Sequence, residues 1–417
     1  MAEGARAAGL IILRRILRYA RKRLDWEAPL DAVCDTRTDP QIPTATIIRS
    51  VAVMFLARLG SLNALEQSSG SAFWRKWLGA QMPSADTVGR VCADVDLDGV
   101  RLISRQVYAR LKRGKAIRPP AHGLMAAVLD GHESHATYLR CCDGCLQRTI
   151  ETRNGTNIQY YHRHVTLQLV GQDMTLLLDA EPILPGEGEL PTAIRLLERV
   201  LEHYPRAFDV VMGDALYANS TFFNYVLSRG KDALAVLKDE TRDLWGDAQS
   251  LFAGMAPVEI PRGRWLADCW DLEGFTSWPQ VSRPVRVVQS LERTTICRQL
   301  DGRDEPLESH WAWVTTLAGA QASTRAVLEL GHRRWAIENE GFNELSTRQH
   351  ADHVYRHHPR AMLVFLLLAM ICCNVLLAFY QRDLKPALRD SVSMLHISRL
   401  IAGELYYLRC GLPRAPT

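Results

Sequence analysis

The middle of the chain alternates short, unbroken apolar runs with stretches whose apolar positions recur at helical spacing. Unbroken apolar runs that end at polar or glycine positions are typical of buried strands. The predicted order is three strands, a helix, a strand, a helix and a strand, which indicates an α/β fold. The predicted strands are residues 123–129, 160–170, 175–180, 208–212 and 233–237, and the helices are 191–204 and 219–229.

Two flanking regions differ from this core in their pattern. The N-terminal region is predicted to be helical, and one of its helices ends in the basic sequence RLKRGK. Short helices of this kind fit either a helix-turn-helix DNA reader or a helical packing domain. A later stretch rich in tryptophan and proline, with short β-like runs, predicts an inserted β-rich subdomain. The predicted regions are 1–120 (helical), 121–239 and 306–382 (core), 240–305 (insertion) and 383–417 (C-terminal helical tail).

Residues 361–380 form a long apolar segment in which Asn374 is the one strongly polar residue. Its length permits a transmembrane helix. It is the only such segment, and it follows directly on the polar helix predicted at 324–348. We therefore prefer the interpretation that it is a core helix packed against the sheet, and we expect no membrane partner.

The composition is that of a folded protein with more than one domain. The 417 residues are 47% hydrophobic and 23% charged, and the net charge of +4 gives no global signal for nucleic acid. Basic residues are concentrated locally, at 1–24 and 105–118, where they suit phosphate binding or a solvated helix face. The ten scattered cysteines suit a reducing compartment. The arginine-rich start also fits a transit peptide, although a plain N-terminal helix is the preferred interpretation.

Three acids occupy unusual positions in this pattern. Read at helical phase, Glu338 shares an arc with large apolar residues, where a carboxylate is costly unless it is paired, protonated or metal-bound. Glu340 and Glu344 fall on the opposite, solvated side. Asp130 and Asp214 each follow a predicted strand, and the carboxyl ends of adjacent parallel strands meet at one edge of a sheet. Because Mg²⁺ and Mn²⁺ favour carboxylate ligands, these three acids predict a divalent metal site.

The same residues resemble the DDE transposases of bacterial insertion sequences, in the subgroup with a β-strand insertion before the final glutamate. The resemblance covers residues 123–380, and its most specific parts are VLDG, VVMGDALY and RRWAIENEGFNEL. It implies a ribonuclease H-like core in which Asp130, Asp214 and Glu338 bind Mg²⁺ or Mn²⁺. It also implies strand cleavage at transposon ends and transfer into target DNA. A homodimer on paired DNA ends, in a bacterial cytoplasm and associated with the nucleoid, follows from the same resemblance.

The last family motif has the form Tyr-x2-Arg-x3-Glu-x6-Lys. Arg334 and Glu338 fit its middle, whereas Gly331 takes the tyrosine position and Leu345 the lysine position. Arg348, one turn beyond, is a candidate replacement for the lysine. The predicted DNA contacts are Arg334, Arg348, Arg163 and His164, the last two from a basic stretch around the second predicted strand.

A second candidate metal site is the pattern H-x2-H-x6-C-x2-C. Its members His132, His135, Cys142 and Cys145 carry the soft ligands that suit structural Zn²⁺. The alternative is that these cysteines fall by chance in a β-hairpin. Two other functions therefore stay open beside a transposase: a catalytically inactive, transposon-derived DNA-binding protein, and a zinc-dependent hydrolase.

Overall fold

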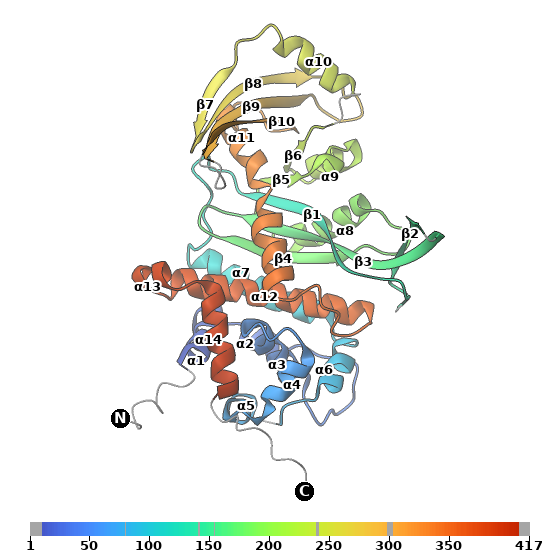
Figure 1. Cartoon of the computed structure of the whole chain (residues 1–417), viewed down its shortest axis with the longest axis vertical. Coiled ribbons are helices and arrows are strands. Elements are labelled where there is room, and N and C mark those ends of the chain that lie inside the picture. The colour runs from blue at the N-terminus through green and yellow to red at the C-terminus, as the bar shows by residue number, and fades with distance from the viewer. Residues whose placement is uncertain are drawn as a thin grey trace.

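The computed structural model describes residues 11–79, 81–140, 142–153, 155–238, 242–297 and 303–407. The start of the predicted basic N-terminal run and the end of the predicted C-terminal tail lie outside these ranges. The described part is a mixed α/β structure in which a ten-stranded sheet stands between helical layers (Figure 1). The predicted α/β class is therefore confirmed.

The first third of the chain is helical, as Figure 1 shows in blue. Its last and longest helix, α7, packs against β4 and α12, and the buried Arg101 on α7 pairs with Asp179 of β4 at 3.1 Å. This helix is therefore a packing element that joins the helical region to the sheet. The elements are α1 (Ile11–Tyr19), a π-helical turn (Ala20–Leu24), α2 (Glu27–Asp31), α3 (Thr44–Leu56), α4 (Leu62–Gln67), a 3₁₀ turn (Ser68–Gly70), α5 (Ala72–Leu78), α6 (Ala85–Cys92) and α7 (Leu97–Arg113).

The first half of the sheet combines antiparallel and parallel pairing. β1 is antiparallel to β3 and parallel to β5, and β5 is parallel to β6. Along the other edge of β3, β2 covers the first half of the strand and β4 the second half. The elements are β1 (Ala126–Thr137), β2 (Leu146–Thr152), β3 (Gly155–Val170), β4 (Thr175–Pro182), α8 (Glu189–His203), β5 (Val210–Gly213), a 3₁₀ turn (Ala215–Tyr217), α9 (Ser220–Ser228) and β6 (Asp232–Val236).

The predicted insertion continues the same sheet. Its long strands pair in antiparallel fashion, and the last of them, β10, pairs with β6 as well as β9, so the sheet order runs β6-β10-β9-β8-β7. A helix, α10, packs against β8 and makes the insertion mixed rather than purely β. The elements are α10 (Asp243–Phe252), β7 (Val258–Arg262), β8 (Trp265–Phe275), β9 (Val285–Cys297) and β10 (Asp304–Thr315).

Both faces of the central strands are buried. Ala127 and Leu129 of β1 belong to one hydrophobic core and Ala126 and Val128 to the other, as side-chain alternation along a strand requires. The first core is shared with the N-terminal helices and α12, and the second with the segment that follows β10. The ends of these central strands therefore lie between two hydrophobic cores.

The segment that follows β10 is not the single α-helix predicted for residues 324–348. α11 (Thr324–Arg333) ends early, and two π-helical stretches follow, Ile337–Phe342 and Glu344–Arg348. The wider π turn changes which side chains share a face, so the predicted phase fails for Glu344. That residue is buried and paired with Arg58, which follows the end of α3, rather than solvated.

The apolar segment near the C-terminus forms α12 (Pro359–Arg382), which is followed by α13 (Pro386–Ser391) and α14 (Met394–Tyr407). Among the described residues, α12 is the one helix long and apolar enough to cross a membrane, and 89% of its most apolar window is buried inside the protein. Asn374 accepts from the backbone N–H of Leu177 at 3.0 Å and donates to its carbonyl at 2.7 Å. The polar residue of this helix thus satisfies the free edge of β4.

Candidate functional site

Asp130 and Asp214 leave neighbouring parallel strands at the same edge. The parallel pairing of β1 with β5 ends at Val128 and Met212. Asp130 follows two residues later, and Asp214 comes directly after the end of β5. β1 runs on to Thr137, so Asp130 is not at the end of its strand as expected, but it is just past the end of the parallel ladder.

The two aspartates interact electrostatically. Burial, together with the neighbouring carboxylates of Asp214 and Glu189, raises the pKa of Asp130 to about 7 against the opposing effect of Arg334. Each aspartate accepts a hydrogen bond at 2.8 Å from a nearby backbone N–H, Asp130 from Gly131 and Asp214 from Leu216. Burial and the nearby carboxylates both disfavour the charged form of Asp130, which therefore binds a proton readily.

Glu338 reaches these acids through an arginine. Arg334 is 4% exposed and donates from Nη1 to the Glu338 carboxylate at 2.9 Å. The same Nη1 lies 3.9 Å from Oδ2 of Asp130, and the guanidinium stacks over the ring of Trp335 at 4.4 Å. The Glu338 side chain is 38% exposed, so its carboxylate is accessible to solvent beside the aspartates.

A fourth carboxylate, Glu189, joins the site from the first turn of α8. It forms an ion pair with Arg163 at 2.6 Å and accepts a hydrogen bond at 3.0 Å from the buried Tyr217 hydroxyl. A Cβ on Gly131 would meet the Glu189 carboxylate at 2.3 Å, so only glycine fits beside Asp130. Sequence reasoning missed Glu189 because it began this helix two residues later, at Pro191. An acid in the first turn of a helix was the signal that could have found it.

The position that departs from the family motif has a steric reason. A Cβ on Gly331 would lie 2.3 Å from the indole of Trp313 on β10. The neighbouring His332 contacts Glu292 of β9, a 1% exposed carboxylate that also pairs with Arg262 at 2.7 Å. These partners lower the pKa of Glu292 to about 2 against the effect of burial. The indole of Trp313 therefore occupies the space that a side chain at position 331 would need. The contact between His332 and Glu292 holds α11 against β9.

The predicted DNA contacts differ in accessibility. Arg348 has a side chain 43% exposed and pairs with Glu344, and Arg163 is 40% exposed and pairs with Glu189. Arg334 is buried among the acids. His164 is also buried, and burial lowers its pKa to about 3, with His132 and Arg163 adding to the effect. The prediction that His164 contacts the DNA backbone is therefore wrong for this structure, because its neutral ring does not reach the surface.

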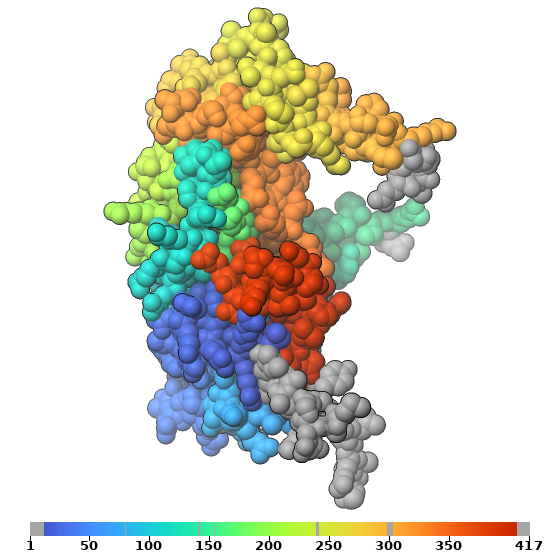
Figure 2. Space-filling model, turned by 90° about the vertical axis from the view of Figure 1, so that its left-hand side faces the viewer, coloured from blue at the N-terminus to red at the C-terminus, as the bar shows by residue number. Residues whose placement is uncertain are grey.

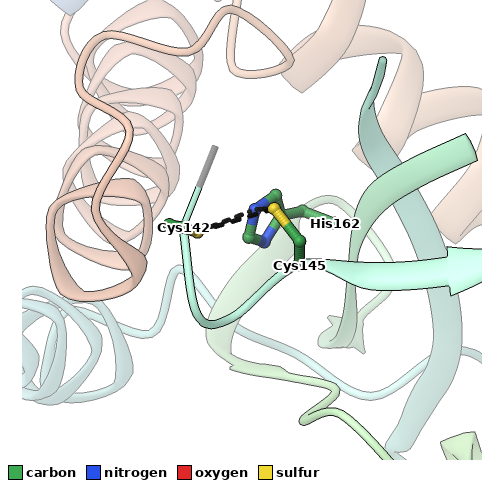
Figure 3. A group of neighbouring side chains, drawn as sticks. All are labelled: Cys142, Cys145 and His162. Carbon is green, nitrogen blue, oxygen red and sulfur yellow. Dashed lines mark hydrogen bonds between the residues drawn. The ribbon is translucent and has the colours of Figure 1, made fainter. Parts of the chain in front are cut away.

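The cysteine motif gathers a different histidine from the one predicted. Cys142, Cys145 and His162 form a group that could hold a metal ion, and all three point toward one another in Figure 3. His132 is not part of it: its Nε2 lies 3.0 Å from Asp352, and its ring stacks on Phe342. The group thus keeps the two cysteines of the predicted set His132, His135, Cys142 and Cys145 but neither of its histidines. His132 pairs instead with His164 farther along the strands.

Searches against protein-family models and curated proteins give no match for this chain. The function is therefore inferred from the chemistry of the carboxylate cluster and of the cysteine group. Oxygen donors with excess negative charge suit Mg²⁺ or Mn²⁺, and thiolates with imidazole suit Zn²⁺.

Proposed function

We propose that the protein is a DDE-type DNA transposase that cleaves the ends of its element and joins them to target DNA. The observation that carries this proposal is the convergence of Asp130 and Asp214 from β1 and β5, with Glu338 tied to Asp130 through Arg334. Asp130 interacts with Asp214 electrostatically and with Glu338 through Arg334, although the three acids were selected from the sequence for separate reasons.

The strand order supports a ribonuclease H-like core. Strands β1, β3 and β4 form an antiparallel meander, and β5 and β6 then extend the β1 edge in parallel, with helices α8 and α9 between them in the chain. Parallel neighbours need such helical crossovers. The inserted strands β7 to β10 come after β6 and before Glu338, where the resembled subgroup has its β insertion.

Asp130, Asp214 and Glu338 would hold the divalent metal. When bound, Mg²⁺ or Mn²⁺ supplies an activated oxygen nucleophile and stabilises the leaving 3′-oxygen in phosphoryl transfer. The surrounding residues set up this site: Arg334 orients Glu338, while Arg163 and Tyr217 hold Glu189 behind the aspartates. The raised pKa of Asp130 fits this role, because a divalent cation relieves the repulsion that otherwise protonates it.

Two surfaces support contact with DNA. The helical N-terminal region holds a pocket of about 480 Å³ lined by basic and aromatic side chains, which suits phosphates and stacked bases. Figure 2 shows the molecule hollowed between the β2–β3 hairpin and the far end of the β9–β10 hairpin, beside the orange residues that follow α11. The pocket is lined by Arg14, Leu17, Arg18, Arg21, Glu27, Arg49, Phe73, Lys76 and Trp77.

The proposal carries the remaining expectations with it. Binding of paired transposon ends implies a homodimer, and DNA as substrate implies a location at the bacterial nucleoid. A catalytically inactive DNA-binding protein would share the surfaces but not the metal-dependent chemistry. A zinc-dependent hydrolase would instead rely on Cys142, and its activity would survive the loss of Glu338.

The test is metal-dependent cleavage of DNA that carries the element's own ends. The unmutated protein is expected to cut in Mg²⁺ or Mn²⁺, and Glu338→Ala to lose on the order of 10³-fold in rate, the equivalent of several kcal/mol of transition-state stabilisation. Glu340→Ala is the matched control, because Glu340 is a neighbouring exposed acid whose partners, Arg333 at 3.7 Å and the Thr175 hydroxyl at 3.0 Å, lie outside the carboxylate cluster.

Three outcomes separate the candidates. Cleavage by the control but not by Glu338→Ala supports the transposase. Cleavage that survives Glu338→Ala and is lost in Cys142→Ser identifies the hydrolase. End binding without cleavage by the unmutated protein, in either metal, identifies the inactive DNA-binding protein.

A further inference from the structure

The Cys142, Cys145 and His162 group already has the spacing of metal ligands. The two sulfur atoms are 3.8 Å apart, and Nε2 of His162 lies 3.3 Å from Sγ of Cys142 and 3.4 Å from Sγ of Cys145. With Zn–S bonds of about 2.3 Å and Zn–N bonds of about 2.0 Å, tetrahedral zinc requires roughly 3.8 Å between sulfurs and 3.5 Å between sulfur and nitrogen. One ion fits the triangle of atoms with little adjustment.

A fourth ligand is close at hand. His135 of β1 is the direct cross-strand partner of His162 on β3, and directly opposed residues on antiparallel strands bring their side chains together. Its buried Nε2 has no hydrogen-bond partner among the residues that the structure describes, which is costly unless something binds it. A bulge between Glu133 and His135 shifts the register by one residue, and this shift is what places His135 opposite His162.

We propose that Cys142, Cys145, His162 and His135 bind one structural Zn²⁺. Two thiolates and two imidazoles form the closed tetrahedral set that is typical of structural zinc. The site draws on three places in the fold: the turn before β2, strand β3 and strand β1. It is independent of the proposed transposase activity, because none of the four residues belongs to the carboxylate cluster.

The zinc fixes the base of an exposed arm. β2 and the first part of β3 leave the body of the protein, as Figure 1 shows, and most of their side chains are exposed. Few apolar contacts hold such a hairpin. Gly144, inside the cysteine turn, packs so closely on Pro359 that a Cβ would lie 2.9 Å from the proline ring. The zinc therefore also joins the arm to the start of α12.

The first experiment measures the metal content of the full-length protein, purified without added metal. We expect about one zinc per chain, with loss of zinc in Cys145→Ser and in His162→Ala. Cys34→Ser is the matched control, because Cys34 is an exposed free cysteine elsewhere in the chain, and it is expected to keep its zinc. A Co²⁺-loaded sample should show the absorption of a tetrahedral, thiolate-ligated ion.

The assignment of His135 as the fourth ligand is tested by measuring the affinity for zinc. His135→Ala should weaken zinc binding by more than the roughly 10- to 100-fold that loss of an outer-sphere partner costs. His357→Ala is the comparison, because its exposed ring lies 5.7 Å from that of His135 and is the nearest competing imidazole. Loss of affinity in His357→Ala but not in His135→Ala would overturn the assignment of His135.

The role of the site is tested on the unmutated protein, which avoids variants that fail to fold. Removal of zinc by a chelator should increase hydrogen exchange in β2 and the first half of β3 at least about tenfold, while exchange in β9 and β10 stays constant. Protein that carries no zinc and takes up none at stoichiometric concentration overturns the proposal. A disulfide between Cys142 and Cys145 in protein purified under reducing conditions overturns it as well.

Discussion

The carboxylate cluster and the cysteine–histidine group meet along strand β1, which carries Asp130 of the first and His135 of the second, yet they are built in different ways. Three cross-strand pairs connect them along β1 and β3: Asp130 with Thr166, His132 with His164, and His135 with His162. The carboxylate end depends on sheet topology, because its acids come from parallel strands far apart in the chain. The thiolate end depends on a turn and a bulge. A change of topology would destroy the first, and a change of register would destroy the second.

The two ends also differ in how their charge is balanced. The acids carry their own cation, since Arg334 touches both Asp130 and Glu338. At the cysteine group, Arg140 donates to the backbone carbonyl of Cys142 at 3.4 Å and pairs with Asp143 at 3.6 Å. We therefore expect the carboxylate cluster to keep its structure without metal, because the buried Arg334 balances part of its charge. We expect the cysteine–histidine group to depend on its zinc ion.

The largest change in the free energy of unfolding is expected for Arg334→Ala. Removal of one partner from a buried charged network costs about 3–5 kcal/mol in the free energy of unfolding, because the remaining charges are left uncompensated. Mg²⁺ should restore part of that loss, and zinc content should not change. Urea denaturation with and without Mg²⁺ measures it. The control is Arg90→Ala, whose partner Asp86 is likewise four residues away but exposed, with an expected change within about 0.5 kcal/mol. Equal stability of the two variants would contradict the role of Arg334.

A smaller effect is the pH dependence of stability, which has opposite signs for Asp130 in the carboxylate cluster and for the neighbouring His164. Asp130 has its pKa raised to about 7 in the metal-free fold, against about 3.9 when unfolded. Between these values the native state holds the extra proton, so stability falls as pH rises. His164 has its pKa lowered to about 3, against about 6.5 unfolded. Here the unfolded state holds the extra proton, so stability rises with pH from about 3 to 6.5.

The two slopes oppose each other, and each is worth at most about 4–5 kcal/mol over its range. Metal-free protein should therefore show little net dependence between pH 4 and 6.5. Asp130→Asn should expose the rising slope, and His164→Leu the falling one, in denaturation midpoints measured across this range without divalent cations. If both variants keep the flat profile of the unmutated protein, neither group titrates as the structure indicates.

The sequence was informative at the carboxylate end because strand order is visible as apolar pattern. Asp130 and Asp214 were selected because each follows a predicted strand and parallel neighbours bring their carboxyl ends together, although β1 in fact runs on past Asp130. Glu338 was selected from an α-helical phase that the π-helical stretches do not keep. The same phase misplaced Glu344, whose burial depends on pairing with Arg58 from a distant part of the chain.

At the thiolate end, the sequence could supply only the local part. Two cysteines three residues apart are visible as a motif, but His162 lies 17 residues beyond the nearer one and is reached by β-pairing. A register that contains a bulge cannot be read from alternation, because one extra residue exchanges the faces of the strand. His132 was chosen on spacing alone, but it lies opposite His164, and the bulge gives His135 rather than Ser134 the place opposite His162.

The smallest predicted effect tests that last distinction. His132→Phe keeps an aromatic ring where the imidazole stacks on Phe342 at 4.6 Å, but it removes the contact with Asp352 at 3.0 Å. The loss of one partly exposed hydrogen bond is worth about 1 kcal/mol in the free energy of unfolding. Zinc content should stay at the unmutated level, because this ring takes no part in the cysteine group. Loss of zinc in His132→Phe, with zinc kept in His135→Ala, would instead mean that the spacing in the sequence identifies the ligand better than the register of the strands does.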